Sequence, residues 1–100
     1  MRNSQYTLNE VRYLVENYER DTRRRKFDLL HAKLIDIDRA LCLLRYLQPK
    51  AYIAVLLVGL AGVDSRTAGV LAGYSHQTML TRYEHALKTM MQYLNAGRRN

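Results

Sequence analysis

The sequence predicts an all-α protein of four to five helices. Apolar residues recur at spacings of three and four along most of the 100 residues, as they do on the buried face of a helix. No segment alternates apolar and polar residues over the length that a strand would need. A chain of this size can bury one core without a metal or a disulfide. We divide it into an N-terminal helix with a basic segment, residues 1–28, and a helix-turn-helix domain, residues 29–100.

The first predicted helix begins after Thr7, which forms a capping box with Glu10. We expect it to end near Arg20 or Asp21. Four consecutive positive charges follow, Arg23–Lys26, and no Gly or Pro separates them from the next helical pattern, so residues 7–47 form one helix or two. The charged run is either a solvated stretch or an arm that contacts DNA phosphates. The apolar stripe of this helix consists of Leu8, Val11, Leu14, Val15 and Tyr18.

A second apolar stripe precedes Pro49, which ends one helix and suits the first position of the next. The run Ala51–Val63 predicts a central helix that is buried on nearly all sides and closed by Gly62; it is too short to span a bilayer. The single cysteine, Cys42, is predicted to be a small core residue in a reducing, cytoplasmic protein. The stripe before Pro49 consists of Phe27, Leu30, Leu34, Ile37, Leu41, Leu44 and Leu47.

The segment Asp64–Leu87 predicts two helices joined by a tight turn. Asp64 or Ser65 can cap the first helix, and Gly73 stands where a chain leaving a helix often needs positive φ. Ser75 can cap the second helix, with Tyr74 filling the corner. The first helix is expected to place Ala68, Leu71 and Ala72 on one face.

The second of these helices has two distinct faces. Its core face is expected to carry Met79, Tyr83, Ala86, Leu87, Met90 and Leu94. Its opposite face carries His76, Gln77, Leu80, Thr81, Lys88 and Gln92. A polar face at the N-terminal end of a helix backed by core is typical of helices that enter the DNA major groove. An ordinary helical hairpin with a solvated outer face is the alternative.

Charge and composition favour a nucleic-acid partner. The net charge of +7 attracts anions, and nucleic acid is the commonest anionic partner of a small helical domain. The three histidines are scattered without Cys or acidic neighbours at ligand spacing, so we predict no metal site and no cofactor. The sequence shows no activated Ser or Cys constellation, no acid–base pair and no glycine-rich phosphate loop, so the protein is not expected to be an enzyme.

From about Ile37 to Leu94 the chain resembles region 4 of bacterial sigma factors and the small sigma-like regulators of phages and mobile elements. The family's recognition helix commonly has the pattern Ser-x-x-Thr-Val-x-x-Arg-x-x-x-Ala-Leu. The segment Ser75–Leu87 matches this pattern at its serine, threonine, arginine, alanine and leucine, with Met79 in place of the valine. Upstream, Leu47–Gln48–Pro49 matches the family's helix break, and Ala68–Gly69 falls where the family has an aliphatic–Ala pair.

This resemblance implies a transcription regulator that binds double-stranded DNA. Gln77 is expected to pair with adenine, and Leu80 to pack on a thymine methyl group. Sigma recognition helices often have arginine or glutamate at these two positions, which implies a target other than a standard promoter element. The base-reading residues would be His76, Gln77, Leu80 and Thr81. The phosphate contacts would be Arg66, Ser75, Thr78 and Arg82, together with Arg23, Arg24 and Arg25 if the basic run reaches the duplex.

A second function is also consistent with the resemblance, because region 4 docks on RNA polymerase. The protein would then bind RNA polymerase or a sigma factor through an exposed apolar stripe, Leu8–Val15–Tyr18, and its DNA affinity would be non-specific. The first helix either folds back on the core or pairs with a second copy. A homodimer would predict two half-sites about one helical turn apart.

Overall fold

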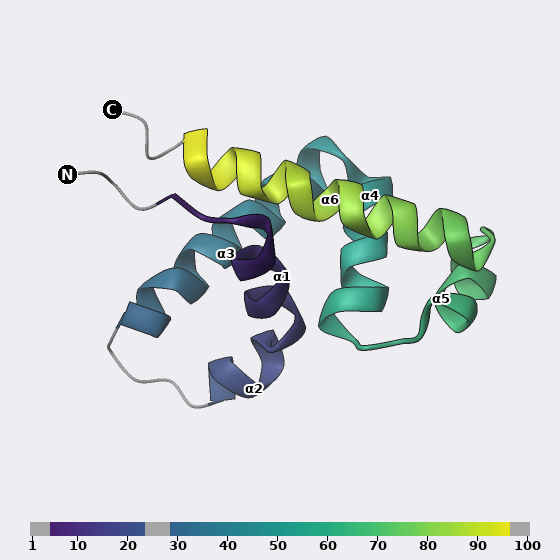
Figure 1. The fold of residues 1–100 in the computed structure, drawn as a ribbon, viewed down its shortest axis with the longest axis horizontal. Helices are drawn as coiled ribbons and strands as arrows, with labels where there is room; N and C mark the ends of the chain where they lie inside the picture. The colour runs from purple at the N-terminus through teal and green to yellow at the C-terminus, as the bar shows by residue number, and fades with distance from the viewer. Residues whose placement is uncertain (1–4, 24–28, 97–100) are drawn as a thin grey trace.

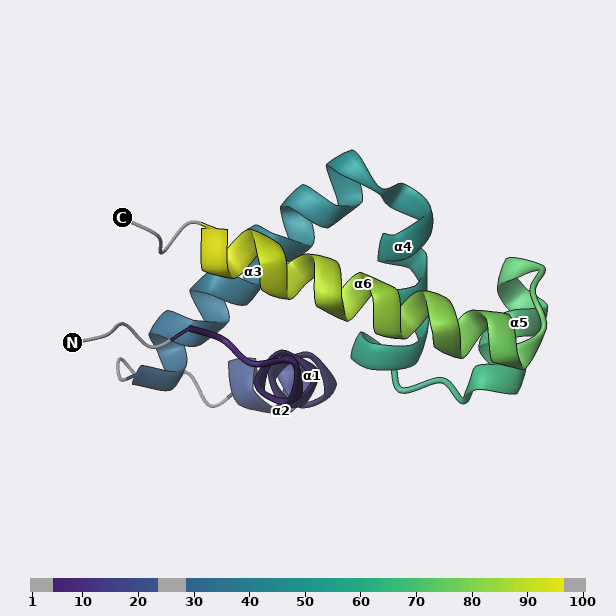
Figure 2. The same cartoon turned by 45° about the horizontal axis from the view of Figure 1, so that its top comes forward.

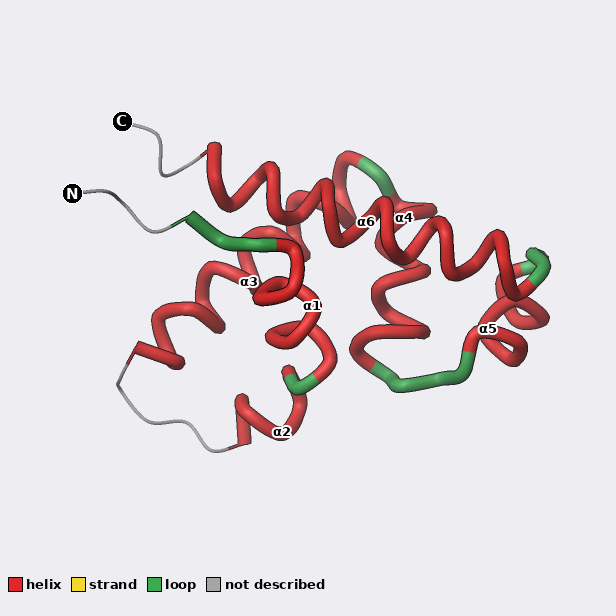
Figure 3. The backbone as a smooth tube through the Cα atoms, in the orientation of Figure 1, coloured by secondary structure: helices red, strands yellow, loops and turns green. Residues whose placement is uncertain are grey.

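The computed structural model describes residues 5–23 and 29–96, and within these ranges the chain is helical and contains no strand. Its six α-helices exceed the predicted four to five by at least one, while the all-α class is confirmed for this part of the chain. Helix α6 runs along most of the long axis, and α2 lies apart from it (Figures 1 and 3). In chain order the elements are α1 (Leu8–Glu16), α2 (Tyr18–Arg23), α3 (Leu29–Leu47), α4 (Pro49–Ala54), the π-helix η1 (Val55–Leu60), α5 (Ser65–Ala72) and α6 (His76–Ala96).

Helix α1 folds back on the core. Thr7 caps it as predicted, because the Thr7 hydroxyl oxygen accepts a hydrogen bond from the Glu10 amide at 3.1 Å. The helix packs against α3, α6 and η1, and its apolar stripe faces the core, with Leu8 and Tyr18 partly buried. The alternative in which this stripe is an exposed partner surface is therefore wrong. The buried residues of α1 are Val11, Leu14 and Val15.

The first helix is also shorter than predicted. It ends at Glu16 rather than near Arg20 or Asp21, and α2 begins two residues later. The residue between them, Asn17, has φ −109° and ψ 13°, outside the α region. Its side-chain amide donates a hydrogen bond to the carbonyl oxygen of Tyr13 at 2.8 Å. Asparagine often ends a helix in this way, because its side chain competes with the backbone for hydrogen-bonding groups.

Helix α3 buries the described residues of the apolar stripe predicted for it, with one exception. Leu34, Ile37, Leu41 and Leu44 are buried. Leu47, at the last residue of the helix, is 55% exposed. Cys42 is exposed as well, so its prediction as a core residue is wrong. The cysteine follows Leu41 directly, and one step along a helix turns a side chain about 100° away from the buried stripe. The remaining two positions of the predicted stripe, Phe27 and the side chain of Leu30, lie outside the described residues.

The predicted central helix starts with Pro49 in its first turn and is continuous from α4 into the π-helix η1. Its closing residue, Gly62, has φ 68°, which glycine adopts at little cost. The expectation of burial on nearly all sides is wrong, because Ile53 and Leu56 are about 40% exposed. Within η1, Gly59 is buried where a Cβ atom would collide with Val15, so η1 passes close to α1. No described helix is both long and apolar enough to cross a membrane.

Helix α6 is the central helix of the fold. It packs against α1, α3, α4, α5 and η1, and Figure 2 shows it crossing α3 and reaching α5 at its N-terminal end. Its predicted core face is confirmed, since all six of those residues are buried. One core therefore includes side chains on both sides of the predicted boundary after residue 28.

Candidate nucleic-acid interface

At the corner between α5 and α6, a tight turn joins the two helices. Asp64 caps α5, because its carboxylate accepts hydrogen bonds from the amides of Arg66 (3.1 Å) and Thr67 (3.0 Å). These bonds to Thr67 and Arg66 lower the pKa of the Asp64 carboxyl group, since they favour its charged form. At the other end of α5, Gly73 adopts φ 84°, as predicted.

The turn is tight because α5 contains a glycine, Gly69, that packs directly against the backbone of the turn. Gly69 is buried within α5, and a Cβ atom at this position would collide with the backbone carbonyl oxygen of Tyr74. The Tyr74 amide in turn donates a hydrogen bond to the carbonyl oxygen of Gly69 at 2.7 Å. The chain can reverse direction here only because no side chain separates the two backbone segments.

The three residues of α5 that were predicted to share one face differ in exposure. Ala68 is buried and Ala72 half-buried, whereas Leu71 is 66% exposed. Gly69 takes the inner position next to Ala68, and this turns Leu71 and Val70 outward.

Ser75 and Thr78 form the cap of α6. The Ser75 hydroxyl oxygen accepts a hydrogen bond from the Thr78 amide at 3.2 Å, and the two hydroxyl groups lie 3.0 Å apart in a hydrogen bond. Both residues are exposed, so they can also meet an external phosphate oxygen. They thus start the helix at the place where the sequence predicts phosphate contacts.

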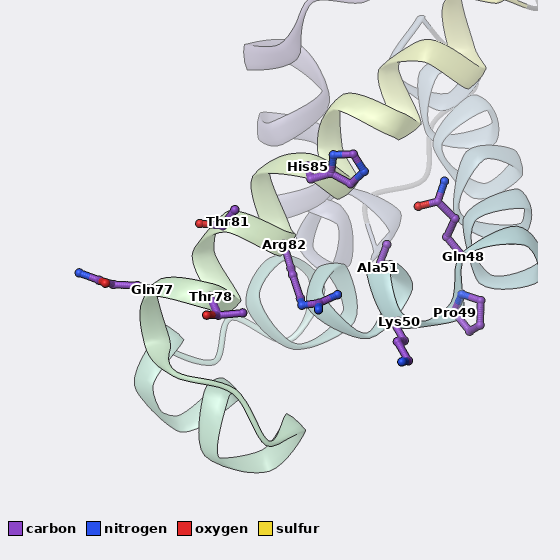
Figure 4. A pocket seen from close by; sticks show the side chains of 9 residues that line it. All are labelled: Gln48, Pro49, Lys50, Ala51, Gln77, Thr78, Thr81, Arg82 and His85. Carbon is purple, nitrogen blue, oxygen red and sulfur yellow. The ribbon is translucent and has the colours of Figure 1, made fainter.

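The predicted base-reading residues lie on the first two turns of α6. Gln77, Leu80 and Thr81 are exposed, and His76 is half-buried. Gln77 extends away from the body of the protein (Figure 4). The Met79 side chain on the opposite face is 1% exposed, so this end of the helix is firmly supported from behind.

The Arg82 side chain is more enclosed than that of an ordinary surface residue. Its guanidinium carbon lies 4.4 Å from the centre of the Tyr74 ring, a cation–π distance. Its Nε atom is buried and has no hydrogen-bond partner within the described structure. The side chain extends from α6 towards α4 (Figure 4).

Arg82 lies in a groove of about 910 Å³ between α4 and α6. One wall is the start of α4, formed by Gln48, Pro49, Lys50 and Ala51. The other wall is α6, formed by Gln77, Thr78, Thr81, Arg82 and His85. No Asp or Glu lines this groove. Lys50, Gln48 and His85 were not among the predicted site residues, although His85 continues the spacing of Gln77 and Thr81 along one helix face.

The remaining predicted phosphate contacts are not part of this groove. Arg66 is exposed on the first turn of α5. Arg23 ends α2, where its guanidinium bonds to Glu19 at 2.9 Å, and α2 lies in the half of the molecule away from α5 (Figures 1 and 2). Arg24 and Arg25 lie outside the described residues. Within the described ranges, no three His, Cys, Asp or Glu side chains are grouped as metal ligands.

Comparisons of the chain with protein-family models, with curated proteins and with solved structures found no match. The features that bear on function are therefore the corner, the outer face of α6 and the groove beside it.

Proposed function

We propose that this protein is a cytoplasmic transcription regulator that binds duplex DNA in a sequence-specific manner, with the first turns of α6 in the major groove. The observation that carries the proposal is the division of α6 into two faces. Its buried face fixes the helix to the core, while Gln77, Leu80 and Thr81 project from a capped N-terminal end. A helix held in this way can present side chains to base edges without itself becoming ordered on binding.

The exposed residues suit the chemistry of base edges. A glutamine amide can donate to and accept from adenine at once, a leucine can cover a thymine methyl group, and a threonine can bond to several bases. The resemblance of Ser75–Leu87 to the sigma recognition helix supports the same placement. In this proposal His76 has a smaller role than Gln77, because it is half-buried.

Charge supports DNA as the partner. The net charge is +7, and several cations of α1–α3 are neutralised by carboxylates in the structure, namely Arg12 by Glu84, Arg20 by Asp21, Arg23 by Glu19 and Lys33 by Glu10. In contrast, the groove beside α6 contains two cations and no carboxylate. A surface of this kind attracts a phosphate backbone.

Capture of RNA polymerase or a sigma factor has less support. The apolar stripe assigned to that partner packs on the core, with Val15 buried and Leu8 and Tyr18 partly buried, so such a partner would need another surface. A pull-down with core polymerase, run beside a salt-dependent DNA shift assay, separates the two functions. Tight polymerase capture with sequence-independent DNA binding would favour the second.

The direct test is selection of bound duplexes from a random pool. We expect a recovered consensus, and tighter binding of the consensus duplex than of a scrambled duplex of the same length and composition. A specific site is typically bound about 10³-fold or more tightly than non-specific DNA. Recovery of no consensus, or equal affinity for both duplexes, would contradict the proposal.

A further inference from the structure

We propose that the groove between α4 and α6 holds the phosphodiester backbone of one DNA strand, with Lys50 and Arg82 as its cationic ligands and Tyr74 as the residue that positions Arg82. This inference rests on the proposed function and extends it. It adds a second wall, α4, to a site that sequence reasoning placed on α5, α6 and the basic run alone.

The two cations of the groove have no carboxylate partner. Neither Lys50 nor Arg82 forms an ion pair with any residue in the described ranges, and the groove lining contains no acid. Lys50 is exposed at the second residue of α4, across the groove from α6. A negative group entering here would meet a cation from each wall without displacing an internal salt bridge.

Arg82 is held in place before any ligand arrives. Its guanidinium lies over the Tyr74 ring at 4.4 Å, and its buried Nε has no partner among the described residues. A guanidinium fixed on an aromatic ring loses less conformational freedom when it binds an anion, which favours affinity. Tyr74 is thus a positioning residue, whose effect on the ligand passes through Arg82.

The rest of the groove suits a backbone rather than an isolated ion. The hydroxyl groups of Thr78 and Thr81 lie along the same wall as Arg82, and His85 continues it for another turn. Gln77 lies at the edge of this wall and points away from it (Figure 4). A strand lying in the groove would therefore run beside the residue proposed to contact bases.

Salt titration of DNA binding tests this inference. We would measure the affinity of the unmodified protein, Lys50→Ala and Lys88→Ala for the selected duplex and for a scrambled duplex, across a range of salt concentrations. Lys88 is exposed on α6 but outside the groove, so it is the matched control. We expect K50A to weaken binding of both duplexes about equally and to reduce the salt slope by about 0.9. K88A should leave the slope unchanged.

The role of Tyr74 requires a separate pair of variants. Tyr74→Phe keeps the ring and should bind like the unmodified protein, whereas Tyr74→Leu should lose affinity. Each is also made in an Arg82→Leu background, where Y74L should cause no further loss if Tyr74 acts only through Arg82. Equal losses of affinity in both backgrounds would overturn the positioning role.

The results separate this inference from the proposed function. If K50A binds the consensus duplex with an unchanged salt slope, the assignment of the groove to a DNA strand is overturned. The proposed helix-turn-helix function then remains intact. Absence of any sequence preference counts against the function itself.

A titration with inorganic pyrophosphate tests for a small phosphate ligand. The backbone amides of residues 48–51 are followed by NMR during this titration. Saturable binding of pyrophosphate without duplex binding would overturn the assignment to a DNA strand. Because Lys50 is exposed, K50A remains informative even if a Tyr74 variant fails to fold.

Discussion

The hydroxyl group of Tyr83 donates a hydrogen bond to the carboxylate of Glu16 at 2.9 Å and thereby joins α6 to α1. Burial of the tyrosine, together with this bond to Glu16, raises the pKa of the Tyr83 hydroxyl. Arg12 and Glu84 add a salt bridge between the same two helices. The N-terminal helix is therefore fastened to the helix that presents the candidate interface.

We predict that Tyr83→Phe lowers the free energy of unfolding by about 1–2 kcal/mol, because it removes the hydroxyl group of a buried tyrosine and with it the hydrogen bond to the Glu16 carboxylate. Urea denaturation followed by circular dichroism measures the change. Tyr46→Phe is the matched control, since Tyr46 is 84% exposed and should lose less than about 0.5 kcal/mol. Equal effects of the two substitutions would contradict a structural role for the Tyr83 hydroxyl.

The two glycines of the corner are expected to differ in which replacements they tolerate. Gly73 needs its positive φ but has open space around it, so Gly73→Ala should cost about 1 kcal/mol and Gly73→Asn less. At Gly69 a Cβ atom meets backbone, so Gly69→Ala and Gly69→Ser should both cost about 1–3 kcal/mol. Thermal or urea unfolding of the four variants measures this. If a Gly69 variant were as stable as the unmodified protein, the backbone of the corner would be able to shift and accept a side chain.

Acidification should weaken the cap of α5. The folded-state pKa of Asp64 is lowered by hydrogen bonds from Thr67 and Arg66. A group with a depressed pKa stabilises the fold above its unfolded value and loses that contribution as the pH falls through the folded value. Below about pH 4, the melting temperature of the unmodified protein should therefore fall more steeply than that of Asp64→Asn. Melting curves from neutral to acid pH check this; parallel curves for the two proteins would contradict it.

If α6 enters the major groove, Gln77→Ala should cost about 1–3 kcal/mol of binding at one base position and relax the preference there. The measurement is a set of affinities for the selected duplex and its single-base variants. Gln92→Ala is the matched control, because Gln92 is exposed on the same helix far from its N-terminal end. A Q77A profile that equals the unmodified profile at every position would exclude direct contact by this side chain.

Local features of the sequence were sufficient to predict the corner. Asp64, Gly73 and Ser75 act on their immediate neighbours through caps and backbone conformation, and these effects do not depend on the rest of the fold. The core face of α6 was equally predictable, because the spacing of its residues fixes which side they share.

Other features of the fold were not predictable in this way. Periodicity did not indicate that Asn17 would interrupt the first helix or that the central helix would continue as a π-helix. Cys42 was assigned to the core because it is apolar, although its place one residue after the buried Leu41 turns it outward. The groove was missed because Lys50 and Arg82 are 32 positions apart in the sequence and meet only through the packing of α4 on α6.

The length of α6 has a consequence for its dynamics. One helix of 21 residues provides both the projecting first turns and much of the core. Its middle amides cannot exchange with solvent deuterium by a local opening unless the core opens with them. We therefore expect the amides of residues 83–90 to exchange only at the rate of global unfolding, which gives the interface the rigidity of the whole protein rather than that of a surface loop.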